Sequence, residues 1–165
     1  MIRAIAFAVM LVPLAGCGLK PLYAGGASGP VATSLSAISV APIPNRAGWL
    51  MRNALVDRLG GDNKNAPYRL EVELDDAITG FGIRGDRSVT RERRTLRARY
   101  RLIQQSSGLV LLDATAGSDA GIDVVSSPYA TVAAEQTALE RLSRVVADQI
   151  VARLALYATS RPIGQ

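Results

Sequence analysis

The sequence contains no histidine and only one cysteine, and both facts limit the chemistry available to the protein. Without histidine there is no Ser-His-Asp or Cys-His catalytic arrangement, and no zinc site with histidine ligands. With one cysteine, no disulfide forms within the chain, so the fold depends on packing alone. No P-loop or G-x-G-x-x-G fingerprint occurs, and none of the 14 acidic residues stands out as a catalytic pair. The sequence therefore predicts a protein that is not an enzyme and binds no metal.

Long hydrophobic runs are also missing. The longest uncharged apolar run, residues 4–15, contains Pro13 and is shorter than the ~20 residues that a transmembrane helix needs. It follows Arg3 and ends in Leu14-Ala15-Gly16-Cys17, as in a secretory signal peptide with small residues before the cut. Residues 1–16 are therefore predicted to be a cleaved signal peptide.

The Leu-Ala-Gly-Cys sequence that ends at Cys17 resembles a bacterial lipobox. In that motif the cysteine thiol takes a diacylglycerol, the signal is cut before the cysteine, and the new amine is acylated. Several acyl chains together hold a protein firmly in a membrane. Cys17 is therefore the predicted lipidation site, and its diacylglycerol and N-acyl chain are the only non-protein groups expected. The alternative is a plain signal peptide with an incidental cysteine.

After cleavage, loss of Arg3 lowers the formal net charge of +5 by one, which leaves a moderately basic chain. Residues 17–37 are rich in small residues and are expected to form a lipidated flexible tether spanning about 25 Å. Residues 38–160 have the size of one domain with one core. Residues 161–165 form a tail.

The pattern of apolar residues predicts an α+β fold with the order β-α-β-β-β-α. We expect a two-layer α/β sandwich, in which two helices, one of them long and C-terminal, cover one face of a four-stranded sheet. The expected elements are a strand at 35–43, a helix from Asn45 or Arg46 to Gly60-Gly61, a strand at 68–75, a hairpin loop at 79–88, a strand at 91–102, a turn at Ser106-Ser107-Gly108, a strand at 109–116 and a helix from Ser127-Pro128 or Thr131.

Two predictions concern the helices. Trp49, near the start of the first helix, is expected to lie in the core, although it could instead be a binding anchor. In the last helix, Glu140 and Arg144 form a favourable i,i+4 pair opposite an apolar stripe. The stripe comprises Val132, Leu139, Leu142, Val146, Ile150, Leu154 and Tyr157.

A row of arginines is the strongest chemical feature after the lipobox. Read as a strand, residues 91–102 direct Arg91, Arg93, Arg97, Arg99 and Arg101 to one face, which the sheet leaves uncovered. The opposite face then carries Leu96, Ala98, Tyr100 and Leu102.

Cross-strand pairing accounts for part of this row. If the hairpin centres near Gly85, Glu71 faces Arg99 and Glu73 faces Arg97, each pair contributing roughly 0.2 to 1 kcal/mol. In this register, the two arginines nearest the loop face no acid.

Those two, Arg91 and Arg93, together with Arg84 and Arg87 in the loop, are the candidate binding residues. Three interpretations remain: charge pairing alone, binding of lipopolysaccharide phosphates by guanidinium groups, and docking onto an acidic protein surface. Nucleic acid is not an expected partner, because the arginine run contains only Tyr100 for stacking, and Tyr100 is predicted to point inward.

The start of the predicted mature chain, Cys17-Gly18-Leu19-Lys20-Pro21-Leu22-Tyr23, resembles the C-G-F-x-P-L-Y start of proteobacterial LPS-assembly lipoproteins, the LptE (RlpB) family. Leu19 departs from the usual aromatic residue. The resemblance extends through the Arg-x-Arg-Tyr-Arg-Leu strand and Gly108 in the turn that follows. It ends with Ser127-Pro128-Tyr129-Ala130, Ala134-Glu135 and Ala147-Asp148-Gln149-Ile150.

The resemblance implies a two-layer sandwich and a non-enzymatic function. It implies a plug and assembly partner of the outer-membrane β-barrel LptD, which takes part in lipopolysaccharide transport to the outer leaflet and insertion there. Gly18, rather than Asp, after the lipidated cysteine fits sorting to the outer membrane. The protein would be lipid-anchored there, facing the periplasm or inside the barrel lumen. A wet, charged sheet face suits a polar lumen.

Two other function classes remain as alternatives. One is an auxiliary lipoprotein of an ABC-type lipid transport system in the cell envelope. The other is an envelope hydrolase, which the missing histidines and undistinguished carboxylates disfavour.

Overall fold

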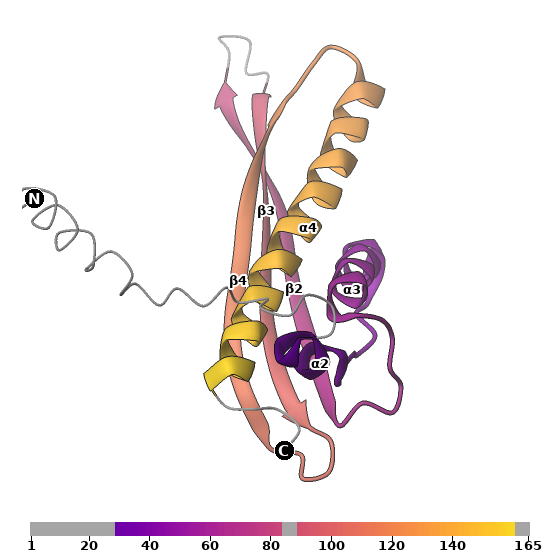
Figure 1. Cartoon of the computed structure of the whole chain (residues 1–165). Coiled ribbons are helices and arrows are strands. Elements are labelled where there is room, and N and C mark those ends of the chain that lie inside the picture. Colours follow the sequence, from indigo (N-terminus) through magenta and orange to yellow (C-terminus); the bar gives the residue numbers. More distant parts are fainter. Residues whose placement is uncertain (1–28, 84–88, 161–165) are drawn as a thin grey trace, which may run out of the picture.

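The computed structural model describes residues 29–83 and 89–160, and shows one four-stranded sheet with helices packed against one of its faces (Figure 1). The strand order is β1-β2-β3-β4. The α+β class, the sandwich of helices on a four-stranded sheet and the long last helix are confirmed, with three helices in the described part of the chain where two were expected. In chain order the elements are α2 (Pro30–Ser36), β1 (Ile38–Val40), α3 (Asn45–Leu59), β2 (Tyr68–Ile83), β3 (Val89–Gln104), β4 (Val110–Asp123) and α4 (Pro128–Ser160).

Alternation along β2 and β3 decides which sheet face is buried. On β3, the four inward residues predicted from the sequence are all buried, and the odd-numbered arginines between them lie on the other face. The buried face meets all three helices in one core, whereas the outer face is exposed along most of its length. The even-numbered β3 residues buried in that core are Leu96, Ala98, Tyr100 and Leu102.

The β2–β3 hairpin is longer than predicted. Pairing continues to Ile83↔Val89, so the expected loop at 79–88 is wrong for Thr79 to Ile83. Glu71 and Glu73 therefore face Arg101 and Arg99 rather than the predicted arginines. The observed register differs from the predicted one by two residues. Side chains on a strand alternate between the two faces, so a shift of two residues leaves each charged side chain on the face that was predicted for it.

The two outer strands also differ from expectation. β1 covers only Ile38–Val40, pairs in parallel with Tyr68–Leu70, and leaves the sheet where Pro42 and Pro44 lack N–H groups. At the other edge, β4 extends beyond the expected 109–116 and ends at Asp123.

Helix α2 corrects the predicted tether. Residues 17–37 were expected to pack little, but Pro30–Ser36 forms a helix that buries Val31 and Leu35 in the core. Pro30 favours the start of a helix. The N–H group at the first position of a helix has no partner within the helix, so proline, which lacks this group, loses no hydrogen bond there. The predicted signal peptide, Cys17 and the first part of the tether lie outside the described residues.

Helix α3 begins at Asn45 and ends where Gly60 adopts the left-handed conformation (φ 92°), as predicted. The prediction for Trp49 is wrong, because its side chain is 63% exposed. Met51 and Leu55 are fully buried and mark the inner side of α3. Trp49 is two positions before Met51, which places it about 200° around the helix, on the side that faces solvent.

Helix α4 begins at Pro128 and packs against the sheet, α2 and α3 (Figure 1). Most of the predicted stripe is buried, but Val132 is exposed and Tyr157 is only partly buried. Among residues 128–137 only Thr131 is buried, so the first turns of α4 contribute little to the core.

Candidate functional site

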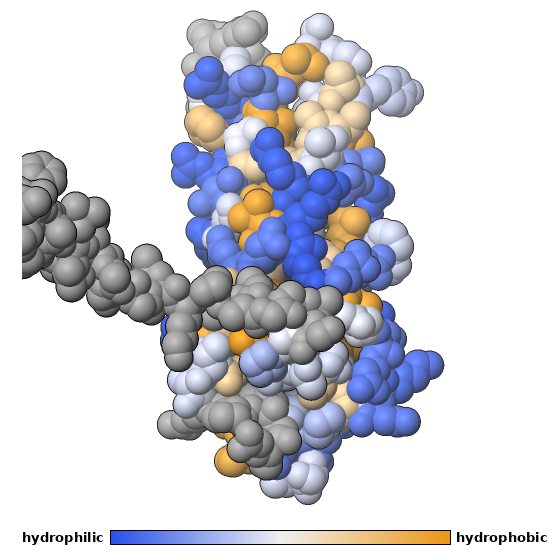
Figure 2. Space-filling model, viewed as in Figure 1, coloured by the Kyte–Doolittle hydropathy of each residue, from blue (hydrophilic) through white to orange (hydrophobic). Residues whose placement is uncertain are grey.

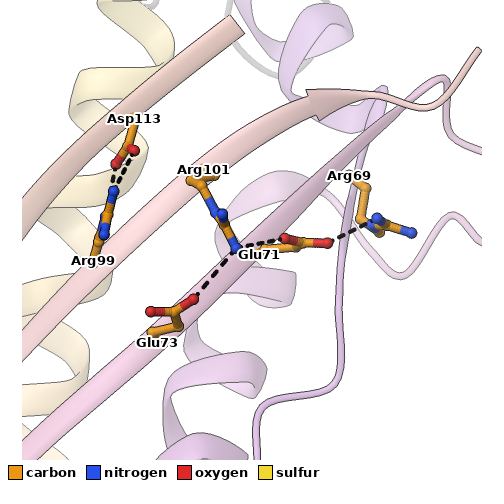
Figure 3. Close-up of polar contacts among 6 residues, drawn as sticks. All are labelled: Arg69, Glu71, Glu73, Arg99, Arg101 and Asp113. Carbon is orange, nitrogen blue, oxygen red and sulfur yellow. Dashed lines mark hydrogen bonds and ion pairs between the residues drawn. The ribbon is translucent and has the colours of Figure 1, made fainter. Parts of the chain in front are cut away.

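The outer face of β2, β3 and β4 carries a network of ion pairs (Figure 3). Arg101 lies between two carboxylates, with its Nη2 3.2 Å from Glu71 and 3.3 Å from Glu73. Glu71 also accepts a hydrogen bond from Arg69 at 2.8 Å. This end of the face is therefore held by alternating charges rather than by a row of free cations.

Strand β4 supplies further acids that the sequence argument missed. Arg99 donates two hydrogen bonds to Asp113, at 3.1 and 2.8 Å (Figure 3). These bonds lower the pKa of Asp113 and raise that of Arg99. Asp119 accepts a bond from Thr95 at 2.7 Å and lies 3.4 Å from Arg97. The Thr95 bond and the Arg97 charge lower the pKa of Asp119.

The face is thus polar but largely neutralised. Arg97, Arg99 and Arg101 each have a carboxylate within 3.4 Å, and so does Arg69. Charge pairing, the first of the three interpretations, therefore accounts for the middle of the face. Exposed pairs of this kind contribute little to stability. They make the surface polar and hydrated, and because positive and negative charges alternate, the surface does not strongly attract ions of either sign.

The candidate residues nearest the hairpin tip differ from this pattern. Arg91 lies 3.4 Å from Asp123, and both side chains are well exposed. Arg93 forms no ion pair with the described residues; its guanidinium carbon lies 5.4 Å from the centroid of the Phe81 ring, in a cation–π contact. Arg84 and Arg87 lie outside the described residues. Arg91 and Arg93 lie two residues apart on β3 and therefore share the outer face of the sheet.

Hydrophobic side chains are exposed at the same end of the molecule as Arg91 and Arg93. Figure 2 shows hydrophilic residues across the middle of the visible face and hydrophobic residues near the upper end, beside the start of α4. We call this end, with its two arginines, the amphiphilic tip. Its exposed hydrophobic residues are Ile78, Phe81, Val125, Tyr129 and Val132.

An ion pair on the helix-covered face was missed from the sequence. Arg94 donates to Asp76 at 2.8 and 2.5 Å and to the carbonyl oxygen of Glu135 on α4 at 2.9 Å. The hydrogen bond with Asp76 raises the pKa of Arg94. The signal was present, because Arg94 is an even-numbered residue of β3, in line with Leu96 and therefore directed inward.

Other kinds of site are not seen in the described part of the chain. Residues 29–83 and 89–160 contain no group of three acidic, histidine or cysteine side chains placed to hold a metal ion. None of the described helices combines the length and hydrophobicity that crossing a membrane requires.

Comparison with known proteins identifies related chains. A family model described as lipopolysaccharide-assembly, LptE, matches residues 35–154. An uncharacterized protein of Rickettsia prowazekii is 29% identical over 144 residues, covering 87% of this chain and 90% of that protein. The family match includes all four strands, α3 and most of α4.

Solved structures of lipoproteins share the fold. A putative lipoprotein from Caulobacter crescentus superposes with a TM-score of 0.68 at 25% identity, covering 81% of this chain and 98% of that one. Rare lipoprotein B from Shewanella oneidensis gives 0.56 at 11% identity, covering 74% and 95%. Lipoprotein B from Nitrosomonas europaea gives 0.59 at 11% identity, covering 74% and 84%.

Proposed function

Because the chain belongs to the lipopolysaccharide-assembly family LptE, we propose that it is the plug and assembly partner of an LptD-type β-barrel in the outer membrane. In this role it takes part in lipopolysaccharide transport to the outer leaflet and insertion there. The family match over residues 35–154 carries the proposal. The protein works without a catalytic site, and its only attached groups are the diacylglycerol and N-acyl chain on Cys17.

The neutralised charged face supports a location inside a barrel. The interior of such a barrel is polar and hydrated. A face covered by paired charges, such as Arg99 with Asp113 and Arg101 with Glu71, keeps its hydrogen bonds in that setting. Unpaired arginines would instead attract anions or acidic proteins without selectivity.

The amphiphilic tip supports contact with lipopolysaccharide. Arginine binds phosphate through bidentate hydrogen bonds, and Arg93 has no competing carboxylate among the described residues. The Arg91–Asp123 pair is exposed and therefore weak enough to exchange its carboxylate for a phosphate. Exposed Phe81, which faces Arg91 and contacts the Arg93 guanidinium group, offers apolar contact to an acyl chain. Arg84 and Arg87 would add charge to the same site.

Co-purification from outer membranes tests this function. The full-length protein carries a C-terminal tag, which leaves Cys17 free for lipidation, and is captured from detergent-solubilised membranes. We expect one large β-barrel in stoichiometric amount. Recovery of ABC-transporter subunits without a barrel would instead assign the protein to an auxiliary lipoprotein of a lipid transport system.

A further inference from the structure

The turn between β3 and β4 is an exposed apolar end of the sheet, and neither the charged face nor the amphiphilic tip includes it. It lies at the opposite end of the molecule from the tip (Figure 1). Leu109 is 59% exposed and its neighbour Val110 is 46% exposed, although both side chains are aliphatic. No charged residue occurs from Leu102 to Leu112, so this end of the hairpin carries no charge of its own.

Several polar groups of this turn are bonded within the turn itself. The Gln104 N–H donates to the Leu109 carbonyl oxygen at 2.9 Å, and the Gly108 N–H donates to the Gln104 carbonyl oxygen at 2.9 Å. The Leu109 N–H donates to the Ser107 hydroxyl oxygen at 3.3 Å, and that hydroxyl donates to the Gln104 side chain at 3.1 Å. Backbone groups without partners make entry into lipid costly. This turn therefore enters an apolar phase at lower cost than an open loop does.

Lys64 places a positive charge beside the turn. Its side chain is exposed, and the acid nearest to it in the sequence, Asp62, is already paired with Arg52 at 2.9 Å. Two positions after Lys64, the Ala66 carbonyl group accepts a bond from the Gln105 side chain at 2.7 Å, which fastens this loop to the turn. A lysine beside exposed apolar side chains suits a phospholipid surface, because its ammonium group reaches the headgroup phosphates.

The predicted lipid anchor lies within reach of the same end. The Ala37 carbonyl group, directly after α2, accepts the Tyr68 N–H at 3.3 Å, and the residue before Tyr68 accepts the Gln105 N–H at 2.9 Å. The C-terminal end of α2 is therefore beside the turn, and the seven residues of this helix add about 10 Å. Residues 17–28, as the predicted tether, span about 20 Å. An acylated Cys17 thus holds this end of the domain near the bilayer.

A bilayer suits this surface better than a protein pocket does. Trp, Tyr and Arg dominate the binding energy of protein interfaces, whereas Leu, Ser and Val are under-represented there. The turn offers Ser106, Ser107 and Gly108 next to its two aliphatic side chains. Two aliphatic side chains bind a membrane weakly by themselves. On an anchored protein, however, the contact is intramolecular and benefits from a high effective concentration.

We propose that the β3–β4 turn is a second membrane contact, in which Leu109 and Val110 enter the headgroup region of the leaflet that holds the acylated Cys17. The inference rests on the proposed lipid anchor and not on the barrel, since it concerns the lipoprotein before a barrel encloses it. Because β3 has 16 residues, this contact holds the amphiphilic tip up to about 50 Å from that leaflet. The tip then stays free for its own ligand.

Fluorescence quenching in vesicles tests this contact. Ser106→Cys, at an exposed position of the turn, provides the only free thiol, because the one native cysteine, Cys17, carries the diacylglycerol. The mature lipidated protein is labelled there with an environment-sensitive fluorophore and reconstituted into phosphatidylethanolamine–phosphatidylglycerol vesicles that contain a lipid-attached quencher. We expect several-fold stronger quenching than for the same label at Val132→Cys in the tip. Equal quenching at the two positions would overturn the proposal.

Matched variants identify the side chains that enter the bilayer. Leu109→Asp/Val110→Asp should remove most of the quenching of the turn label, while the melting temperature stays close to that of the parent because both positions are exposed. Val125→Asp/Val132→Asp replaces two exposed valines at the other end and should leave the quenching unchanged. If the turn variant is quenched as strongly as the parent, the proposal is wrong.

The same vesicles separate this contact from the anchor and from the barrel. Protein that floats with the vesicles while its turn label stays in water would overturn the contact and leave the anchor in place. A turn label that becomes shielded only when the purified barrel is added would identify a protein contact instead. Protein that does not float would overturn the anchor and the contact together, whereas capture of the barrel tests the plug function separately.

Discussion

Arg94 on β3 and Asp76 on β2 form a doubly hydrogen-bonded ion pair on the helix-covered face of the sheet, with donor–acceptor distances of 2.8 and 2.5 Å. Their side chains are 12% and 22% exposed, which is less than in the ion pairs of the outer face, such as Arg99–Asp113. Arg94 also donates to the Glu135 carbonyl group and thereby fastens the first third of α4 to the sheet.

Removal of Arg94 should therefore destabilise the fold. We expect Arg94→Ala to lower the free energy of unfolding by about 3 kcal/mol, because it leaves the Asp76 carboxylate partly buried without its partner. Urea unfolding followed by circular dichroism measures the change. The double variant Arg94→Met/Asp76→Leu should recover most of the loss, since it removes both charges. Equal stability of Arg94→Ala and parent would contradict this role.

Acid should weaken the ion pairs of the outer face. The folded-state pKa of Asp113 is lowered by its bonds from Arg99, so it lies below the unfolded value of about 3.9. The stability that this pair contributes is complete above the unfolded value, and falls as the pH drops through the folded value. Urea unfolding between pH 5 and 2.5 should show this decline, and Asp113→Asn should flatten it. An identical decline in the variant would remove Asp113 as a cause.

The arginines of the amphiphilic tip should affect lipopolysaccharide binding without affecting folding. Arg91→Ala/Arg93→Ala is expected to weaken binding of purified lipopolysaccharide several-fold in a solid-phase assay, while the melting temperature stays unchanged. Arg69→Ala, on the same face but near the opposite end of β2, serves as the control and should bind normally. If the double variant binds as well as the parent, these two arginines are not in the site.

The close approach of Gly48 to the chain before α3 predicts an unusual glycine effect. Alanine in a helix interior is normally favoured over glycine by about 1 kcal/mol. Here a Cβ atom would lie 2.5 Å from the Ile43 carbonyl oxygen, so Gly48→Ala should destabilise the protein by about 1–3 kcal/mol. Gly121→Ala, which has no neighbouring atom within 4 Å, is the matched control for thermal unfolding.

Lipidation at Cys17 can be tested directly. Growth with labelled palmitate should label the parent protein, whereas Cys17→Ala should carry no label and keep residues 1–16. Mass spectrometry of the purified protein gives the N-terminal residue and the attached acyl groups. An unmodified cysteine after cleavage would support the plain signal peptide instead.

The outer and inner faces of the sheet were predictable from the sequence, because alternation on β2 and β3 is a local property. The register between β2 and β3 was not predictable, because it depends on how far β2 continues through Gly80 and Gly82, which are typical of a loop. Asp113 lies inside the expected strand at 109–116, but its ion pair with Arg99 depends on the register between β3 and β4, which was not predicted. Asp119 was missed because the strand was expected to end at Ala116, and Gly117-Ser118 has none of the β-branched and aromatic residues that indicate a strand.

For the helices, local sequence patterns predicted the ends of α3 but neither the exposure of Trp49 nor the presence of α2. The start and end of α3 followed from Asn45 and Gly60, but burial of Trp49 was inferred from residue type rather than from its position relative to Met51. Short α2 gave no usable periodic signal, because seven residues make only about two turns. Its helix depends on packing Val31 and Leu35 against the rest of the core.

Site-specific photocrosslinking in living cells tests the barrel-plug function most directly. A photoreactive amino acid replaces Thr115, which is exposed on the outer sheet face opposite Arg99. If this face lies in a barrel lumen, irradiation should join the protein to one large outer-membrane β-barrel in high yield. Crosslinks to ABC-transporter subunits instead, or none to a barrel that co-purifies with the protein, would contradict the placement of this face in the lumen.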